Sequence, residues 1–174
     1  MGKLEAKGTF INKLSSDKKK NLDVIIQVFK DGGVTNPIFI AAVCCIVSKE
    51  SSFALVRENM NYGSAARLQE VFGIGATKAN EIAGNPKAIA NYVYGATPHG
   101  KRSKKDAYGN EGANDGYNFR GGGFNQLTFK GGYEKYSSIA GTSMTANPDS
   151  ISNSVVAAKI LLQYYKNTIG SVVK

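Results

Sequence analysis

The sequence contains one histidine and two cysteines among its 174 residues, and both scarcities restrict its chemistry. With His99 alone, a two-histidine metal site is excluded and a histidine-based catalytic triad is disfavoured. Cys44 and Cys45 are adjacent within an apolar run, where a disulfide between them would be strained. They also lack the spacing of a zinc site. We therefore predict two buried thiols, and neither a metal ion nor another cofactor.

Long apolar segments are also missing. No run reaches about 18 apolar residues, so we expect no transmembrane helix. Residues 1–5 lack the apolar stretch and the cleavage site of a signal peptide. The sequence thus predicts a protein made in the cytoplasm that does not use the general secretory route unaided. Its length fits a single domain over residues 1–174, and we expect a monomer with a core of its own.

The charge balance is one-sided, with a formal net charge of +9. A basic surface favours polyanions such as nucleic acid, anionic lipid or an acidic cell wall. The densest clusters, Lys18–Lys20 and Lys101–Lys105, are equally well explained as solvated faces or loops. Because no nucleic-acid-binding motif with aromatic platforms is present, we predict no nucleic-acid partner.

Capping signals predict a mainly α-helical chain. Asn36-Pro37 starts one helix, because asparagine caps the first amide groups and proline fits the first turn. This helix is apolar nearly all round, so we predict that it is central and ends near residues 49–52. Other helices are predicted from residues 15–17 to 31, at 64–72, 77–82, 86–94 and 130–139, and from Asn147-Pro148 through 165. A long loop at 95–123 is expected to include a small hairpin at 117–119.

Two glutamates stand at the end of the apolar helix, which suggests acid–base chemistry. A partly buried carboxyl at such a place can hold a proton near neutral pH, and a second carboxylate completes the pair that glycoside hydrolysis uses. On an unbroken helix, Glu50 and Glu58 would lie about 12 Å apart along the axis and roughly 80° apart around it. A turn near Ser51-Ser52 would bring them closer, towards the roughly 6.5–9.5 Å of an inverting enzyme.

A glycine-rich segment provides the second set of candidate residues. Gly121-Gly122-Gly123 lacks the lysine and the spacing of a phosphate loop, and suits backbone that a ligand approaches closely. Asn125, Gln126 and Thr128 follow as polar side chains in an apolar run. Such amides and hydroxyls either bind sugar hydroxyls or cap backbone groups.

Three motifs in order resemble the family 19 glycoside hydrolases, the chitinase group that includes many phage endolysins. They are Glu50-Ser51-Ser52-Phe53, Arg57-Glu58-Asn59-Met60-Asn61-Tyr62 and the segment from Asp115 to Thr128. The resemblance covers residues 36–170, the expected catalytic core. It implies a mainly α, lysozyme-like helical fold with a small hairpin and a substrate cleft.

The resemblance also implies residue roles. Glu50 would be the general acid, Glu58 the base that activates water, and Thr128 would help to hold that water. The implied substrate contacts are Asn61, Tyr62, Arg120, Asn125 and Gln126. The reaction would invert the anomeric carbon without a metal or cofactor. Gly122 and Gly132 depart from the pattern, because the family usually has arginine and asparagine there.

Charge favours one substrate within the class. Chitin is neutral, whereas a bacterial wall carries anionic groups that attract a basic protein. We therefore predict a peptidoglycan hydrolase that cleaves between N-acetylmuramic acid and N-acetylglucosamine. Such a protein, made without a signal peptide, would reach the wall through a holin or within a phage tail or injection particle.

Four alternatives stay open. One is a chitinase. The residues Glu50-Ser51-x-Phe53 and Gly123–Gln126 also resemble lytic transglycosylases or goose-type lysozymes, which use a single glutamate. A non-enzymatic wall-binding particle component is the third. Membrane permeabilisation by a helix at residues 154–174 is the weakest, because its apolar face is expected to be core.

Overall fold

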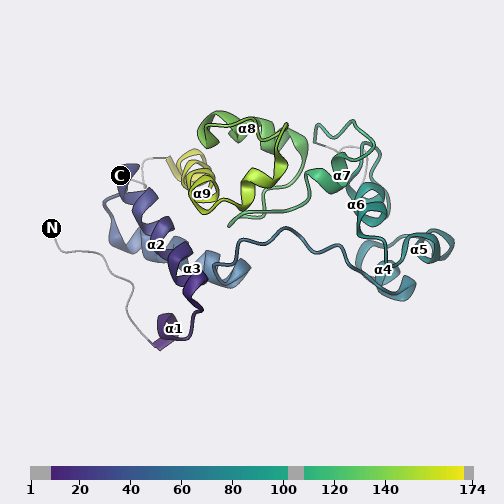
Figure 1. The fold of residues 1–174 in the computed structure, drawn as a ribbon, viewed down its shortest axis with the longest axis horizontal. Helices are drawn as coiled ribbons and strands as arrows, with labels where there is room; N and C mark the ends of the chain where they lie inside the picture. The colour runs from purple at the N-terminus through teal and green to yellow at the C-terminus, as the bar shows by residue number, and fades with distance from the viewer. Residues whose placement is uncertain (1–8, 102–107, 171–174) are drawn as a thin grey trace.

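A computed structural model describes residues 9–101 and 108–170, and this part of the chain is mainly helical without a named strand (Figure 1). Of the basic cluster at 101–105, only Lys101 lies within the described residues. The helices are α1 (Thr9–Asn12), α2 (Ser16–Asp31), α3 (Pro37–Ser51), α4 (Ala65–Phe72), α5 (Ala76–Ile82), α6 (Pro86–Tyr94), α7 (Asp115–Asn118), α8 (Lys130–Ala140), the 3-10 helix η2 (Pro148–Ser152) and α9 (Ser154–Ile169).

The capping signals place most helix ends correctly. The Asn36 side chain accepts hydrogen bonds from the Ile38 and Phe39 amides, so it caps α3 as predicted. Ser64 caps α4 in the same way, and Gly73 ends that helix in the left-handed conformation. Such helix ends can be predicted from neighbouring residues. A side-chain oxygen accepts from free amide groups of the first turn, and glycine, which has no Cβ, adopts the left-handed conformation that ends the helix.

Three buried clusters form the interior. The first packs α2, α3 and α9 together, and the second packs α4, α5 and α6. The third lies under α8, between that helix and α9. Figure 1 shows the first group on the left and the second on the right, with residues 52–64 running between them as an extended trace. The apolar face of α9 is core, as expected, and it buries Ala157, Ala158, Ile160, Leu161, Leu162 and Tyr165.

The prediction that α3 is central is wrong. Only Ile40, Val43 and Val47 are buried along it, and the opposite side faces solvent. The prediction of two buried thiols fails with it, because Cys45 is exposed and Cys44 is half-buried. Composition alone sets how apolar a helix is, but neighbouring elements decide how many of its sides are covered.

Two details of the later chain also differ from expectation. Tyr117 and Asn118 lie in helix α7 rather than in a hairpin. The antiparallel pairing occurs instead as one bridge between Gly122 and Leu127. Asn147-Pro148 opens the short η2, and α9 starts separately after Asn153, whose side chain accepts from two amides of its first turn. A second capping asparagine six residues later thus divides the predicted helix.

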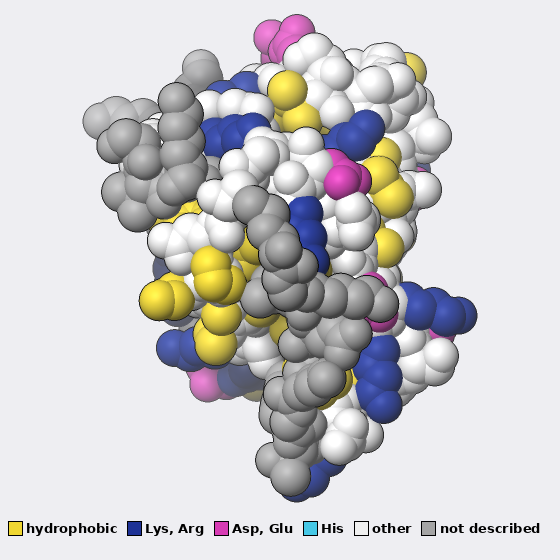
Figure 2. Space-filling model, turned by 90° about the vertical axis from the view of Figure 1, so that its left-hand side faces the viewer, with side chains coloured by type: hydrophobic (Ala, Val, Ile, Leu, Met, Phe, Trp, Pro, Cys, Tyr) yellow, Lys and Arg dark blue, Asp and Glu magenta, His cyan; other side chains and the backbone are white. Residues whose placement is uncertain are grey.

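Two further features of the described residues concern the distribution of basic side chains and the length of the apolar helices. Figure 2 shows Lys and Arg side chains spread over the visible face rather than gathered in one patch. No helix in the two described ranges combines the length and apolarity needed to cross a membrane.

Because of the buried Tyr133 hydroxyl, we expect the free energy of unfolding to fall at alkaline pH. Tyr133 is fully buried and donates a hydrogen bond to the Arg120 carbonyl at 3.0 Å. Burial raises its pKa to about 12, against about 10 in an unfolded chain. The folded state keeps a proton that the unfolded state loses, so this contribution holds below pH 10 and disappears as pH rises to 12. Over that range, the free energy of unfolding of the wild type should fall by roughly 2–3 kcal/mol because of Tyr133, and Tyr133→Phe should not show this fall.

Urea unfolding at a series of pH values measures this effect. Tyr108→Phe is the matched control, because Tyr108 is 58% exposed. Cys44, whose pKa burial also raises to about 12, contributes equally to both variants. If Tyr133→Phe and Tyr108→Phe lose the same stability between pH 10 and 12, the explanation is wrong.

Candidate functional site

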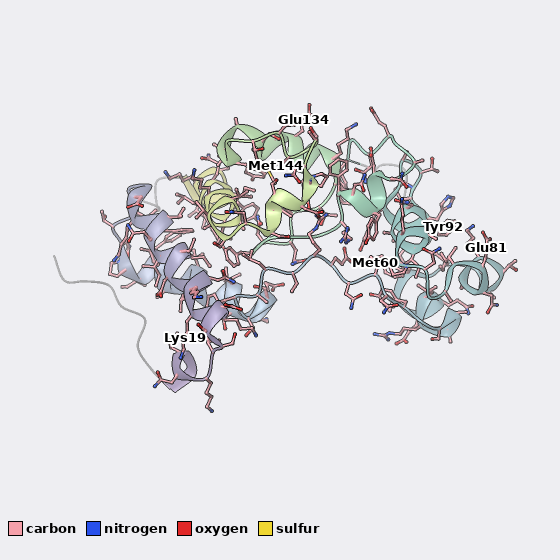
Figure 3. The ribbon with its side chains drawn as sticks, in the orientation of Figure 1. Lys19, Met60, Glu81, Tyr92, Glu134 and Met144 are labelled. Carbon is pink, nitrogen blue, oxygen red and sulfur yellow. The ribbon has the colours of Figure 1, made fainter. Side chains whose placement is uncertain are left out.

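Two irregular segments meet where the three buried clusters adjoin. Residues 52–64 start in the first cluster with Phe53 and reach the second with Met60. Residues 119–129 contribute Phe119 to the third cluster, Phe124 to the first and Phe129 to the second. Figure 3 shows Met60 on the extended trace between the helical groups. Each segment is therefore anchored at both ends, which fixes the residues between the anchors.

Direct hydrogen bonds join the two segments. The Glu58 amide donates to the Gly121 carbonyl at 2.7 Å. The Gly122–Leu127 bridge, with both N–H···O contacts at 2.8–3.1 Å, closes the second segment into a tight turn. The glycine-rich segment thus provides backbone that lies against Glu58.

The Glu58 carboxylate is held by two donors. The Tyr94 hydroxyl donates to Oε1 at 2.7 Å, and the Gly121 amide donates to Oε2 at 3.3 Å. The side chain is half-buried, so one part of it still faces solvent. Hydrogen bonds of this kind fix the orientation of a carboxylate. The arrangement suits a base that must accept a proton from one direction.

Gly121 brings Gln126 to the same place. A Cβ added at Gly121 would lie 2.8 Å from Gln126 Oε1 and 3.3 Å from Glu58 Oε2. The amide and the carboxylate therefore flank one glycine that has no room for a side chain. The family resemblance implied a base role for Glu58 and a substrate contact for Gln126, and in the structure both side chains lie next to Gly121.

Arg57 anchors residues 52–64 to neighbouring parts of the chain. Its side chain is 9% exposed, and its guanidinium donates to the carbonyls of Pro148, Asn118 and Arg120 and to the Asp149 carboxylate. It also lies 5.7 Å from the centre of the Tyr133 ring. Burial lowers the pKa of Arg57 below its usual value. Because Arg57 precedes Glu58, these contacts also restrict the backbone that carries the carboxylate.

The two glycines that depart from the family pattern have different surroundings. A Cβ at Gly122 would lie 2.9 Å from Arg57 Cδ and 2.9 Å from Ile151 Cγ2. The Arg57 stem thus fills the space that an arginine at 122 would need. A Cβ at Gly132 would meet only the tip of Leu127, at 3.0 Å. The first departure is a packing requirement, whereas at Gly132 a larger residue would need only the flexible Leu127 side chain to shift.

Glu50 is placed differently from Glu58. It lies in the last turn of α3 and is exposed, so the partial burial predicted for a general acid is not observed. Within residues 9–101 and 108–170, the Glu50 carboxylate has no hydrogen-bond or ion-pair partner. The helix ends beyond it as predicted, with Ser52 and Phe53 both in the left-handed conformation. This turn separates the two glutamates onto different elements.

The other predicted contacts fall into three groups. Thr128 donates to the Gln126 carbonyl at 2.9 Å, so its hydroxyl supports the turn that carries Gln126. Asn61 is exposed beside the Glu58 segment, and the half-buried Tyr62 packs edge-on against Phe72. Arg120 folds back over the Tyr117 ring at 4.0 Å.

Asn125 has an unusual environment. Its Oδ1 is buried without a protein donor. Most buried polar atoms in proteins are hydrogen-bonded, so this acceptor is an exception among the candidate residues.

Sequence reasoning missed Tyr94 and Asn110. Tyr94 lies at the end of α6, where it resembles any apolar residue of a helix. Asn110 is 3% exposed, donates to the Tyr94 carbonyl at 2.6 Å and accepts from the Lys130 amide at 2.8 Å. It therefore ties the end of α6 to the start of α8. An asparagine in a glycine-rich loop gave no signal for this role.

Backbone strain concentrates at the same place. Among described residues other than glycine, those with positive φ are Ser52, Phe53, Tyr108, Gln126 and Phe129. All but Tyr108 belong to the two crossing segments. Such conformations cost about 1–3 kcal/mol each and cluster at functional sites. Their concentration supports a site at this crossing.

Tyr94→Phe tests the role of the Tyr94 hydroxyl. Removing the 2.7 Å hydrogen bond should leave Glu58 in place but less well oriented, so we expect about a tenfold lower kcat on wall substrate with little change in KM. Tyr92→Phe is the control, because Tyr92 lies on the same helix and stacks on His99 rather than contacting Glu58. An unchanged kcat in Tyr94→Phe would show that the contact does not orient the reacting carboxylate.

No protein-family model and no curated protein matches this chain. The family resemblance thus rests on the three sequence motifs. No cluster of three or more histidine, cysteine or acidic side chains in the described ranges is arranged to hold a metal ion.

Proposed function

We propose that this protein is a glycoside hydrolase that cleaves peptidoglycan between N-acetylmuramic acid and N-acetylglucosamine with inversion. Glu58 is the base that activates water, and Glu50 is the acid that protonates the leaving oxygen. The observation that carries the proposal is the half-buried Glu58 carboxylate, held by Tyr94 and the Gly121 amide and flanked by Gln126.

The position of Glu58 agrees with the role of a base. A water attacking the anomeric carbon must be held and deprotonated at once, so the carboxylate needs a fixed orientation and an adjacent polar group. Two donors fix Glu58, and the Gln126 amide is the adjacent group. Thr128 supports Gln126 through its carbonyl, which makes its role indirect.

Because Glu50 is exposed, bound substrate must provide the surroundings that a general acid needs. An exposed carboxyl gains the environment of a general acid only when a bound ligand removes water from it. A sugar chain lying from Glu58 towards the end of α3 would cover Glu50. The Glu50 carboxyl would then lie against the glycosidic oxygen of the bond that is cleaved.

The charge supports a wall polymer as substrate. The net charge of +9 attracts an anionic wall, whereas neutral chitin gains nothing from it.

A digest of purified peptidoglycan, analysed by mass spectrometry, tests the proposal. Products with reducing ends are expected from wild type, and Glu50→Gln should abolish them while binding to the wall is kept. Glu134→Gln is the control, because Glu134 lies exposed on the outer side of α8 (Figure 3). Anhydro products would support a transglycosylase instead. Wall binding with no products, and with chitin oligomers intact, would support a binding protein.

A further inference from the structure

Helix α3 presents an apolar stripe to solvent. Residues three, four, seven and eight apart share one side of a helix. The exposed residues on this side of α3, which we call the α3 stripe, are Ile38, Ala41, Ala42, Cys45, Ile46 and, at its end, Lys49. Ile38 is 79% exposed and Ile46 is 48% exposed. Ile40, Val43 and Val47 occupy the buried side, so the stripe cannot turn inward.

The composition of the stripe is unusual for a solvent-facing surface. The outer side of a surface helix is normally polar, because only the core-facing side gains from being apolar. Before Lys49, the α3 stripe contains no charged side chain. Figure 2, which views the α2–α3 side of the molecule, shows a contiguous group of hydrophobic side chains among the basic ones. Contact with an apolar partner would therefore remove exposed apolar surface without burying a charge.

Basic residues lie at one end of the stripe. The Asn21 side chain donates to the Phe53 carbonyl at 2.8 Å, so the start of α2 lies beside the end of α3. This brings Lys18–Lys20 of α2 to the same end as Lys49. Asp17, Asp23 and Glu50 are the acidic residues near that end, and Asp17 lies 3.9 Å from the Lys20 ammonium. Four lysines against three carboxylates still leave this end positive.

We propose that the α3 stripe docks on the surface of an anionic lipid bilayer. An apolar helix side flanked by lysines suits the boundary between headgroups and acyl chains, where the apolar side chains insert and the lysines meet anionic headgroups. A second copy of this chain fits less well, because each copy carries +9 and would bring its lysines against those of its partner. The opposite side of α3 is packed in the core, so the helix lies on the bilayer and does not cross it.

This surface is separate from the proposed catalytic residues except at Glu50, and the inference stands whether or not the chain hydrolyses peptidoglycan. Cys45 supplies a direct probe. It is exposed in the middle of the stripe, whereas Cys44 is half-buried and burial raises its pKa to about 12, so a thiol-reactive fluorophore should label Cys45 selectively. The emission of a polarity-sensitive dye at Cys45 should shift to shorter wavelength with vesicles of phosphatidylcholine containing phosphatidylglycerol, and not with phosphatidylcholine alone.

Vesicle sedimentation of the unlabelled full chain gives the affinity. Ile38→Gln combined with Ile46→Gln should weaken binding to the phosphatidylglycerol vesicles by about tenfold or more, because both residues lose their insertion. Replacing Lys18, Lys19 and Lys20 with glutamine should weaken it by about fivefold for each lysine. Val155→Gln is the matched control, since Val155 is 43% exposed on α9 and should leave binding unchanged. Thermal unfolding checks that the variants fold as wild type does.

Three results would overturn the proposal. The first is no binding to the anionic vesicles. The second is binding that the Ile38→Gln and Ile46→Gln pair leaves unchanged, which would assign it to basic residues elsewhere. The third is a dimer in sedimentation equilibrium that the same pair abolishes, without vesicle binding, which would assign the stripe to a second copy of the chain.

Discussion

Glu58→Gln should lower the rate of glycosidic-bond cleavage by at least about a hundredfold, since general-base assistance contributes roughly 10²–10⁴. Glutamine has the shape of glutamate and can still contact Tyr94 and Gly121, so the fold should be kept. What is lost is the carboxylate that takes the proton from water. Release of reducing ends from purified peptidoglycan, followed over time with equal amounts of wild type and variant, measures the change.

The same variant separates two mechanisms. In a lytic transglycosylase the sugar itself supplies the nucleophile, and a single glutamate suffices. Activity close to wild type in Glu58→Gln, together with full loss in Glu50→Gln, would therefore reject the two-carboxylate mechanism. Glu70→Gln is a useful control, because Glu70 is an exposed glutamate on α4 whose partner, Arg67, is also exposed.

Arg57→Met should be among the most destabilising single substitutions in this chain. Methionine can fill the space of the stem, but it cannot replace the four hydrogen bonds of the guanidinium. Each such bond contributes about 1 kcal/mol, and a carbonyl left without a donor costs more. We expect a loss of about 3 kcal/mol, seen as a melting temperature lower by about 10 °C. Cleavage activity should fall as well, because Glu58 is the next residue.

Arg67→Met is the matched control for that measurement. Arg67 also forms a 2.6 Å ion pair, with Glu70, but its side chain is 56% exposed. Pairs of this kind contribute little to stability, so its melting temperature should stay close to that of wild type. Equal effects of the two arginine substitutions would show that Arg57 does not hold the crossing of the two segments.

Local signals in the sequence predicted the helices well. Asn36-Pro37 and Ser64 mark helix starts because their side chains satisfy amide groups within the same turn. The predicted break after Ser51 is confirmed by the left-handed Ser52 and Phe53. The prediction of one helix from Asn147-Pro148 through 165 was wrong because of a second local signal. Asn153 also caps a helix, and it starts α9 separately from η2.

Burial was harder to predict than helix position. The apolar composition of α3 indicated a central helix, yet one side of it faces solvent. Glu50 was expected to be partly buried because it follows an apolar run, and it is exposed. Both errors arise because burial depends on elements distant in the sequence. Tyr94 and Asn110 were missed for the same reason, since their partners lie 36 and 16 residues away in the chain.

The sequence by itself determined where most of the longer helices begin and end, that the chain is basic, and which two segments carry the polar residues of the candidate site. These are properties of neighbouring residues and of composition. Only the tertiary structure decided that Glu58 meets Tyr94 and Gly121, that Arg57 occupies the space beside Gly122, and that α3 leaves one apolar side uncovered. The physical reason is that packing of the three clusters brings segments of the chain that are far apart in the sequence together, and no local pattern encodes that contact.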